Sequence, residues 1–269
     1  MRIRKKITNT INNISERKLS IQFSLDGFSF CASNQKDVVY FFMVCDFNNE
    51  TRSPETILKN IETVFHSEKV LQDDFESVIV IHQNSLNTFV PDIFFDKNEL
   101  KNYLKFSIKT IATDLIVYDD LPKMKNVYIP YVNINNFLFQ NFGEFEYKHH
   151  ATVLVEKLID KSNFPSFYIH VSANTTDLLF IENQQLTFFN SFEYTTKEDF
   201  IYYILFTLEQ LELNPDTTPV TLLGEIEESS ELYKILYMYV RNIAFLKIKN
   251  TFLNTTEELY NHSNILLLT

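Results

Sequence analysis

Glycine is the residue that this sequence most clearly lacks. Its 269 residues include three glycines, Gly27, Gly143 and Gly224, whereas average usage near 7% would give roughly 19. Phosphate-binding loops need residues without a Cβ atom, so that backbone N–H groups can approach the phosphate closely. Three scattered glycines leave little from which such a loop could be built.

Tryptophan is absent, and cysteine occurs only as Cys31 and Cys45. Two cysteines are too few for a disulfide framework. Both lie in expected strands, so we interpret them as buried thiols. The 26 phenylalanines and 14 tyrosines still supply ample material for a hydrophobic core.

Long apolar runs are also missing. No segment approaches the ~20 apolar residues of a membrane span. The basic N-terminus is not followed by the apolar stretch of roughly 7–15 residues that a signal peptide needs, and we expect residues 1–17 to be a frayed polar arm. The formal net charge of −11 opposes non-specific binding to nucleic acid. We therefore expect a cytoplasmic protein without an integral membrane segment or a nucleic-acid partner.

Two stretches of the chain share a plan of three strands joined by tight turns. They cover residues 19–46 and 167–194, where β-branched and aromatic runs alternate with Ser, Asn and Asp clusters, the usual hairpin signal. Ser24 matches Ser172 at an offset of 148 residues. The repeat and the chain length predict two similarly folded halves.

A helix and a buried strand are expected after each of these stretches. Ser53 and Pro54 are typical of a helix start, and residues 77–82 form an apolar run typical of a buried strand. In the second half, the corresponding segments are 197–212 and 219–223. This alternation predicts an α/β fold in which each half has a mixed sheet with crossover helices.

Two further segments complete the expected organisation. Residues 96–108 are expected to form a helix with Asp96 as its N-cap. Residues 114–149 are expected to form a small inserted subdomain, whose helix at 133–141 ends near Gly143. The expected divisions are a basic arm at 1–17, a first half at 18–149 and a second half at 150–269.

The helix expected at 197–212 is apolar around nearly its whole circumference. We therefore expect it to pack between layers, with Phe206 buried. A competing interpretation makes Tyr202 and Phe206 an exposed docking surface, because exposed apolar patches often mark such surfaces.

The duplicated strand–strand–strand–helix–strand–helix plan resembles that of the actin-like ATPases, whose two domains have RNase H-like topology. Over nearly its entire length the chain is similar to an uncharacterised bacterial family of unknown function with this fold. It also resembles the pilus-assembly and cell-division actin homologues. The segments that carry the similarity are residues 24–30, 128–135, 143–149, 190–192 and 198–206.

In active actin-like ATPases, the first strand of each half ends in Asp-x-Gly, and a later Gly-Gly pair cradles the adenosine. Carried over, these motifs fall on residues 22–24, 170–172 and 224–225, where both carboxylates, both loop glycines and one adenosine glycine are replaced. The resemblance thus implies a cleft whose ATP-binding motifs are lost, with no cofactor, no metal and no catalytic residue. The vestigial cleft positions are Gln22, Ser24, His170, Ser172 and Gly224.

Three other candidates have simpler interpretations. Asp26 could replace the first lost carboxylate, but Asp-Gly is also the commonest two-residue hairpin turn. Asp177 could approach the second loop, yet it opens the following strand. His149 and His150 have no third ligand at metal spacing, so we interpret them as a surface pair.

These observations favour a catalytically degenerate actin-like protein, not an enzyme, which acts as a binding or scaffold module for an unidentified protein partner. The alternative is an active ATP-binding protein or small-molecule kinase with divergent phosphate loops. A peripheral membrane adaptor ranks last, because the four apolar residues 265–268 would give little anchoring.

Overall fold

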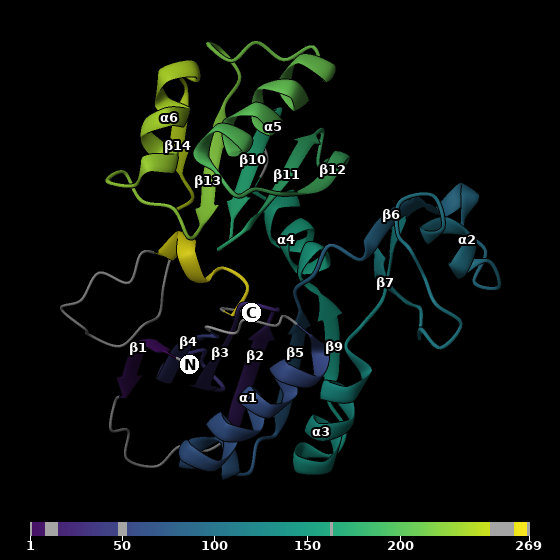
Figure 1. The fold of residues 1–269 in the computed structure, drawn as a ribbon, viewed down its shortest axis with the longest axis vertical. Helices are drawn as coiled ribbons and strands as arrows, with labels where there is room; N and C mark the ends of the chain where they lie inside the picture. The colour runs from purple at the N-terminus through teal and green to yellow at the C-terminus, as the bar shows by residue number, and fades with distance from the viewer. Residues whose placement is uncertain (1, 9–15, 48–52, 162–163, 248–260, 268–269) are drawn as a thin grey trace. The chain divides into compact units, whose positions relative to one another are not determined.

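The computed structural model describes residues 2–8, 16–47, 53–161, 164–247 and 261–267 (Figure 1). These residues divide into two compact units. Unit 1 contains the described residues up to Val153 together with 266–267, and unit 2 contains those from Leu154 together with 261–265. The predicted α/β class with mixed sheets and crossover helices is confirmed.

Unit 1 is built on a six-stranded sheet in the order β1-β4-β3-β2-β5-β9. Strands β2, β3 and β4 form an antiparallel meander, and β5 and β9 extend it in parallel from β2. The bounds in this unit are β1 Arg2–Thr8, β2 Arg17–Phe23, β3 Gly27–Asn34, β4 Val39–Asp46, α1 Pro54–Ser67, β5 Ser77–His82, α3 Val132–Phe142 and β9 Glu146–His149.

The N-terminal segment is not a frayed arm over residues 2–8, so that expectation is wrong there. These residues form β1, which pairs antiparallel with β4. Arg4 makes an ion pair with Asp46, and Lys6 makes one with Glu68. The backbone hydrogen bonds between β1 and β4 and these two ion pairs therefore hold the N-terminal segment in place. Residues 9–15 of the expected arm lie outside the described residues.

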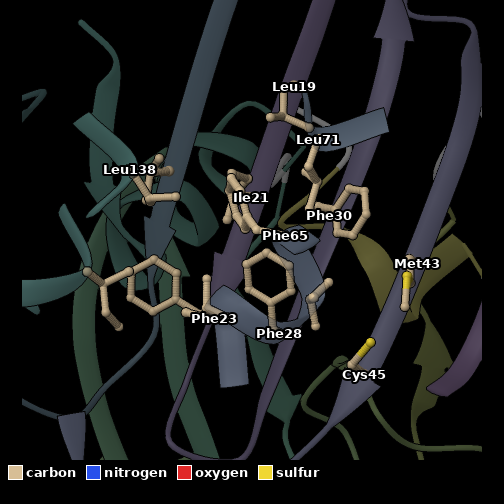
Figure 2. Close-up of a cluster of buried hydrophobic side chains, with 14 of the residues drawn as sticks. Leu19, Ile21, Phe23, Phe28, Phe30, Met43, Cys45, Phe65, Leu71 and Leu138 are labelled. Carbon is tan, nitrogen blue, oxygen red and sulfur yellow. The ribbon is translucent and has the colours of Figure 1, made fainter. Parts of the chain in front are cut away.

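The core of unit 1 forms between one face of the sheet and α1. Alternation along β2 sends Leu19, Ile21 and Phe23 to that face, where they join Phe65 of α1 in one buried cluster (Figure 2). The start of α1 is set locally, because the side chain of Ser53 accepts a hydrogen bond from the backbone N–H of Thr56.

A small three-stranded sheet follows β5 in unit 1, in the order β6-β8-β7. The expected subdomain at 114–149 is divided between two sheets, because β7 and β8 pair with each other and with β6, whereas β9 pairs with β5. The bounds are β6 Asn87–Pro91, α2 Leu100–Leu104, β7 Val117–Leu121 and β8 Met124–Tyr128.

The helix predicted at 96–108 is observed only as the five residues of α2. The carboxylate of Asp96 accepts a hydrogen bond from the backbone N–H of Asn98, two residues on, which is an Asx turn and not a helix cap. Tyr103 also donates its hydroxyl to the carbonyl oxygen of Phe94. These contacts hold the segment before α2 in a turn.

Unit 2 repeats the strand plan of unit 1 in a five-stranded sheet of order β12-β11-β10-β13-β14. The meander is again antiparallel, and the last two strands again add in parallel. Helix α4, His150–Ile159, begins in unit 1 and ends in unit 2. The other bounds are β10 Ser166–Val171, β11 Thr175–Glu182, β12 Gln185–Glu193, α5 Lys197–Gln210, β13 Val220–Gly224, α6 Glu231–Tyr239 and β14 Ile243–Phe245.

Helix α5 begins with a capping box formed by Thr196 and Asp199. Its core face includes Phe200 and Ile204, both fully buried, whereas Phe206 is 44% exposed. The prediction that Phe206 is buried is therefore wrong. The helix packs on one side against the sheet of unit 2, and a helical period of 3.6 residues turns Phe206 away from that side.

Three short 3-10 helices complete the described elements, at Lys69–Gln72, Asp92–Phe94 and Asn261–Asn264. Across the described ranges, no helix has both the length and the apolar character needed to span a bilayer.

Candidate functional site

In each unit, the candidate residues lie where neighbouring parallel strands end. The hairpin between the first two strands of the meander and the loop after the first parallel neighbour leave the sheet at the same edge. Ligands of open α/β sheets bind at this carboxyl edge.

In unit 1, the hairpin between β2 and β3 is closed by its own backbone. The N–H of Ser24 donates to the carbonyl oxygen of Gly27 at 2.9 Å, and the N–H of Phe47 donates to the carbonyl oxygen of Asp26 at 2.7 Å. The hydroxyl oxygen of Ser24 accepts a hydrogen bond from the N–H of Asp26 at 3.1 Å. Asp26 is therefore part of a tight turn, but this turn comprises Leu25 and Asp26 and not the predicted pair Asp26 and Gly27.

Gly27 has a different role from the one its sequence context suggests. It is the first residue of β3, and only Gly143 and Gly224 have positive φ among the described glycines. A Cβ atom on Gly27 would lie 2.8 Å from the carbonyl oxygen of Cys45 on β4. Glycine is needed here for close packing of strands, not for a two-residue turn with positive φ.

Gln22 stands at the position of the first lost carboxylate. Its side-chain nitrogen donates to the side-chain oxygen of Gln83 at 2.6 Å, and Gln83 directly follows β5. A neutral amide pair thus occupies the place that the family motif gives to an aspartate, so the pair supplies no negative charge for a Mg²⁺ ion.

In unit 2, the hairpin between β10 and β11 has the same backbone pattern. The N–H of Ser172 donates to the carbonyl oxygen of Thr175 at 2.9 Å, and the N–H of Tyr194 donates to that of Asn174 at 3.0 Å. The hydroxyl of Tyr194 also donates to the carbonyl oxygen of Ser172 at 2.6 Å. The predicted match between Ser24 and Ser172 is thereby confirmed at the level of hydrogen bonds.

His170 and Asp177 form a buried pair on adjacent strands of unit 2. They face each other in the register of β10 and β11, with His170 Nδ1 2.8 Å from Asp177 Oδ2. The other carboxylate oxygen of Asp177 accepts a hydrogen bond from the Ser191 hydroxyl. In this Ser–Asp–His order the carboxylate lies in the middle, so the serine hydroxyl is bonded to the aspartate and not, as in a Ser–His–Asp triad, to the histidine. The interpretation of Asp177 as a strand residue is confirmed.

The geometry of the sheet requires a residue without a Cβ atom at Gly224. Its φ is +86°, and a Cβ atom there would lie 2.1 Å from the carbonyl oxygen of Val171. The following N–H, of Glu225, donates to that same oxygen at 2.6 Å. The glycine therefore allows β13 to close against the end of β10, which explains its presence without a nucleotide.

Glu225 replaces the second adenosine glycine, and its charge reaches the neighbouring hairpin. Burial raises the pKa of the Tyr194 hydroxyl to about 12, and the negative charge of Glu225 adds to this shift. Glu225 lies beside the loop that would hold a phosphate in an active relative, because its backbone N–H is bonded to Val171, the residue before Ser172. Glu225 is exposed, as are Glu227 and Glu228, so this edge repels anions.

A polar network that the sequence analysis missed is centred on Asp119 in unit 1. This carboxylate accepts hydrogen bonds from the Tyr128 hydroxyl at 3.0 Å, the backbone N–H of His149 at 2.8 Å and the Thr152 hydroxyl at 2.6 Å. Burial raises its pKa, while these hydrogen bonds oppose the shift. Strand alternation places Asp119 on the same face as Leu121, which could have indicated burial.

His149 and His150 are buried, so the prediction of a surface pair is wrong. His149 Nδ1 accepts a hydrogen bond from the backbone N–H of Ala151, which leaves Nε2 to donate to the carbonyl oxygen of Asn84 at 3.0 Å. The ring is thereby fixed in one neutral tautomer. Across the described residues, no group of three or more His, Cys, Asp or Glu side chains could hold a metal ion.

Comparison with solved structures identifies the fold. A protein from Bacteroides thetaiotaomicron with an actin-like ATPase fold and unknown function is 23% identical, with a TM-score of 0.78, and the alignment covers 94% of this chain and 95% of the other. The PilM-PilN type IV pilus biogenesis complex contains a chain that is 10% identical, with a TM-score of 0.60 and coverage of 93% and 96%.

Among curated proteins, no sequence matches at a significant level. The family model described as "Protein of unknown function (DUF3822)" matches residues 6–243. The chain belongs to this family, and its fold is that of the actin-like ATPases.

Proposed function

We propose that this protein is a catalytically degenerate actin-like protein that binds another protein and does not hydrolyse ATP. The observation that carries the proposal is the position of Glu225, an exposed carboxylate whose backbone N–H is bonded to Val171 beside the hairpin of Ser172. An ATP phosphate would meet a negative charge where active relatives offer a small polar loop. The neutral pair of Gln22 and Gln83 supports the same conclusion in unit 1.

A protein-binding role is supported by the similarity to a chain of the PilM-PilN complex, a structure that holds two proteins together. The exposed aromatic side chains of Tyr202 and Phe206 on α5 also suit this role. The buried thiols of Cys31 and Cys45 suit the reducing cytoplasm, in which we place the protein.

Titration calorimetry of the full chain with ATP and Mg²⁺ tests the proposal. We expect no binding heat and no change in melting temperature at millimolar ATP. The test is sensitive, because a bound ligand at about 100 times its Kd would stabilise the protein by about 2.7 kcal/mol and raise its melting temperature. ATP binding at micromolar affinity would overturn the proposal and favour the alternative of an active ATP-binding protein or kinase.

Two variants of Glu225 sharpen this test. Glu225→Gln removes the charge and keeps the side chain, whereas Glu225→Gly also restores the second glycine. If the charge and the lost glycine exclude nucleotide, any gain of ATP binding should be larger for Glu225→Gly than for Glu225→Gln.

A further inference from the structure

Strand β12 is a long open edge of the unit 2 sheet. Within the part of the chain that the structure describes, it pairs with β11 on one side and has no strand on the other. Its nine residues, Gln185–Glu193, include no Lys, Arg or Pro. Proteins usually guard exposed edges with such residues or keep the strands very short. The opposite edge, β14, has only three residues.

Unit 1 shows what covers the equivalent edge. There the third strand of the meander, β4, is covered by β1, whose seven residues include Arg2, Arg4, Lys5 and Lys6. The side chain of Arg4 lies 2.9 Å from Asp46, the last residue of β4. Lys6 lies 2.7 Å from Glu68, the residue that follows α1. The covering strand is therefore basic, and it binds carboxylates at the ends of β4 and α1.

Unit 2 has carboxylates at the matching places. Glu193 is the last residue of β12, and Glu209 and Glu212 lie at the end of α5. All three are exposed. None of them makes an ion pair with any residue that the structure describes. Unit 2 thus has carboxylates at the places that bind β1 in unit 1, but no basic strand pairs with β12 among the described residues.

A row of aromatic rings runs from this edge onto α5. The rings of Phe192 and Tyr203 stack with centroids 4.6 Å apart, and Tyr203 contacts Tyr202 at 5.4 Å. Tyr202 and Phe206 stack at 6.0 Å and are 60% and 44% exposed. Faces of aromatic rings bind both apolar side chains and the cations of Lys and Arg.

We propose that the β12 edge and this aromatic row form a docking site for an extended, basic segment of a partner protein. The segment adds antiparallel to β12, as β1 adds to β4, and its Lys or Arg side chains reach the carboxylates of Glu193 and Glu209. Main-chain hydrogen bonds give affinity in such strand addition. A second copy of this chain fits less well, because its net charge is −11 and its own β12 has no cation. The inference rests on the proposed protein-binding function.

A labelled peptide with the sequence of β1, Arg2–Thr8, is the probe, because that strand covers the equivalent edge in unit 1. We expect it to bind the full-length protein in fluorescence anisotropy, more weakly as salt is raised. Hydrogen exchange should slow in residues 185–193 and stay unchanged in β4. A peptide of the same charge with a central proline is the control, since proline removes a backbone donor.

Paired variants locate the site. Glu193→Lys combined with Glu209→Lys, and Tyr202→Ala combined with Phe206→Ala, should each weaken binding by about tenfold. The matched exposed residues Tyr237 on α6 and Glu227 serve as controls, and Tyr237→Ala and Glu227→Lys should leave affinity within about twofold.

Several outcomes would overturn the inference. These are no binding of the peptide, equal binding of the proline peptide, slowed exchange in β4 in place of β12, or equal affinity for all variants. A dimer in sedimentation equilibrium that dissociates with the Tyr202 and Phe206 variants would assign the edge to a second copy. Each of these results is independent of the ATP titration, so failure of the docking site is distinguishable from failure of the proposed function.

Discussion

Replacing Gly224 by alanine tests whether this glycine serves the sheet. The new Cβ atom would lie 2.1 Å from the carbonyl oxygen and 2.8 Å from the nitrogen of Val171, and both are backbone atoms of β10. Relief requires that β13 move away from β10, which breaks the hydrogen bond from the N–H of Glu225 to Val171.

The expected cost has three parts. A non-glycine residue at φ of +86° costs of order 1–3 kcal/mol, overpacking costs about 1–3 kcal/mol, and a lost backbone hydrogen bond costs about 1 kcal/mol. We therefore expect Gly224→Ala to lower the free energy of unfolding by about 4 kcal/mol, a large fraction of the stability of a typical domain.

Gly143→Ala is the matched control, because Gly143 has φ of +73° but no atom within 4 Å of an added Cβ. It should cost only the backbone term, about 1–3 kcal/mol. Urea unfolding followed by far-UV circular dichroism and tyrosine fluorescence measures both variants, since the chain has no tryptophan. If Gly224→Ala costs no more than Gly143→Ala, the steric argument is refuted.

Three other predictions concern stability and its pH dependence. Phe206→Ala should cost less than about 1.5 kcal/mol because the ring is 44% exposed, whereas Phe200→Ala in the same helix should cost about 3–5 kcal/mol; equal costs in urea unfolding would contradict this. Burial lowers the pKa of His82 to about 3, so the unfolded state takes up the proton first as pH falls below about 6.5. Stability should then decline from pH 6.5 to 5 by up to about 1.4 kcal/mol per pH unit, and His82→Gln should lose this slope in thermal melts. Thr152→Val removes the hydroxyl that accepts a hydrogen bond from Asn126 and donates one to Asp119. It should lower the free energy of unfolding by about 1–3 kcal/mol. Thr63→Val, at an exposed site, should change the melting temperature little.

The sequence by itself determined the features that depend on neighbouring residues. Ser53 caps α1, Thr196 and Asp199 form the capping box of α5, and Gly143 ends α3 with positive φ. The repeated hairpins were also predictable, because strands and turns have characteristic residue types. Such signals need only a few adjacent residues, so they are readable before any tertiary contact is known.

Tertiary structure decided which side chains are buried and what they contact. Phe206 belongs to an apolar helix, yet it is exposed because α5 packs on one side. His149 resembles a surface residue but is enclosed and bonded to Asn84, 65 positions away. The basic residues of β1 are ordered because β4 provides a ladder and Glu68 provides a carboxylate. In each case the deciding partner is remote in sequence, and burial depends on layers that local pattern does not specify.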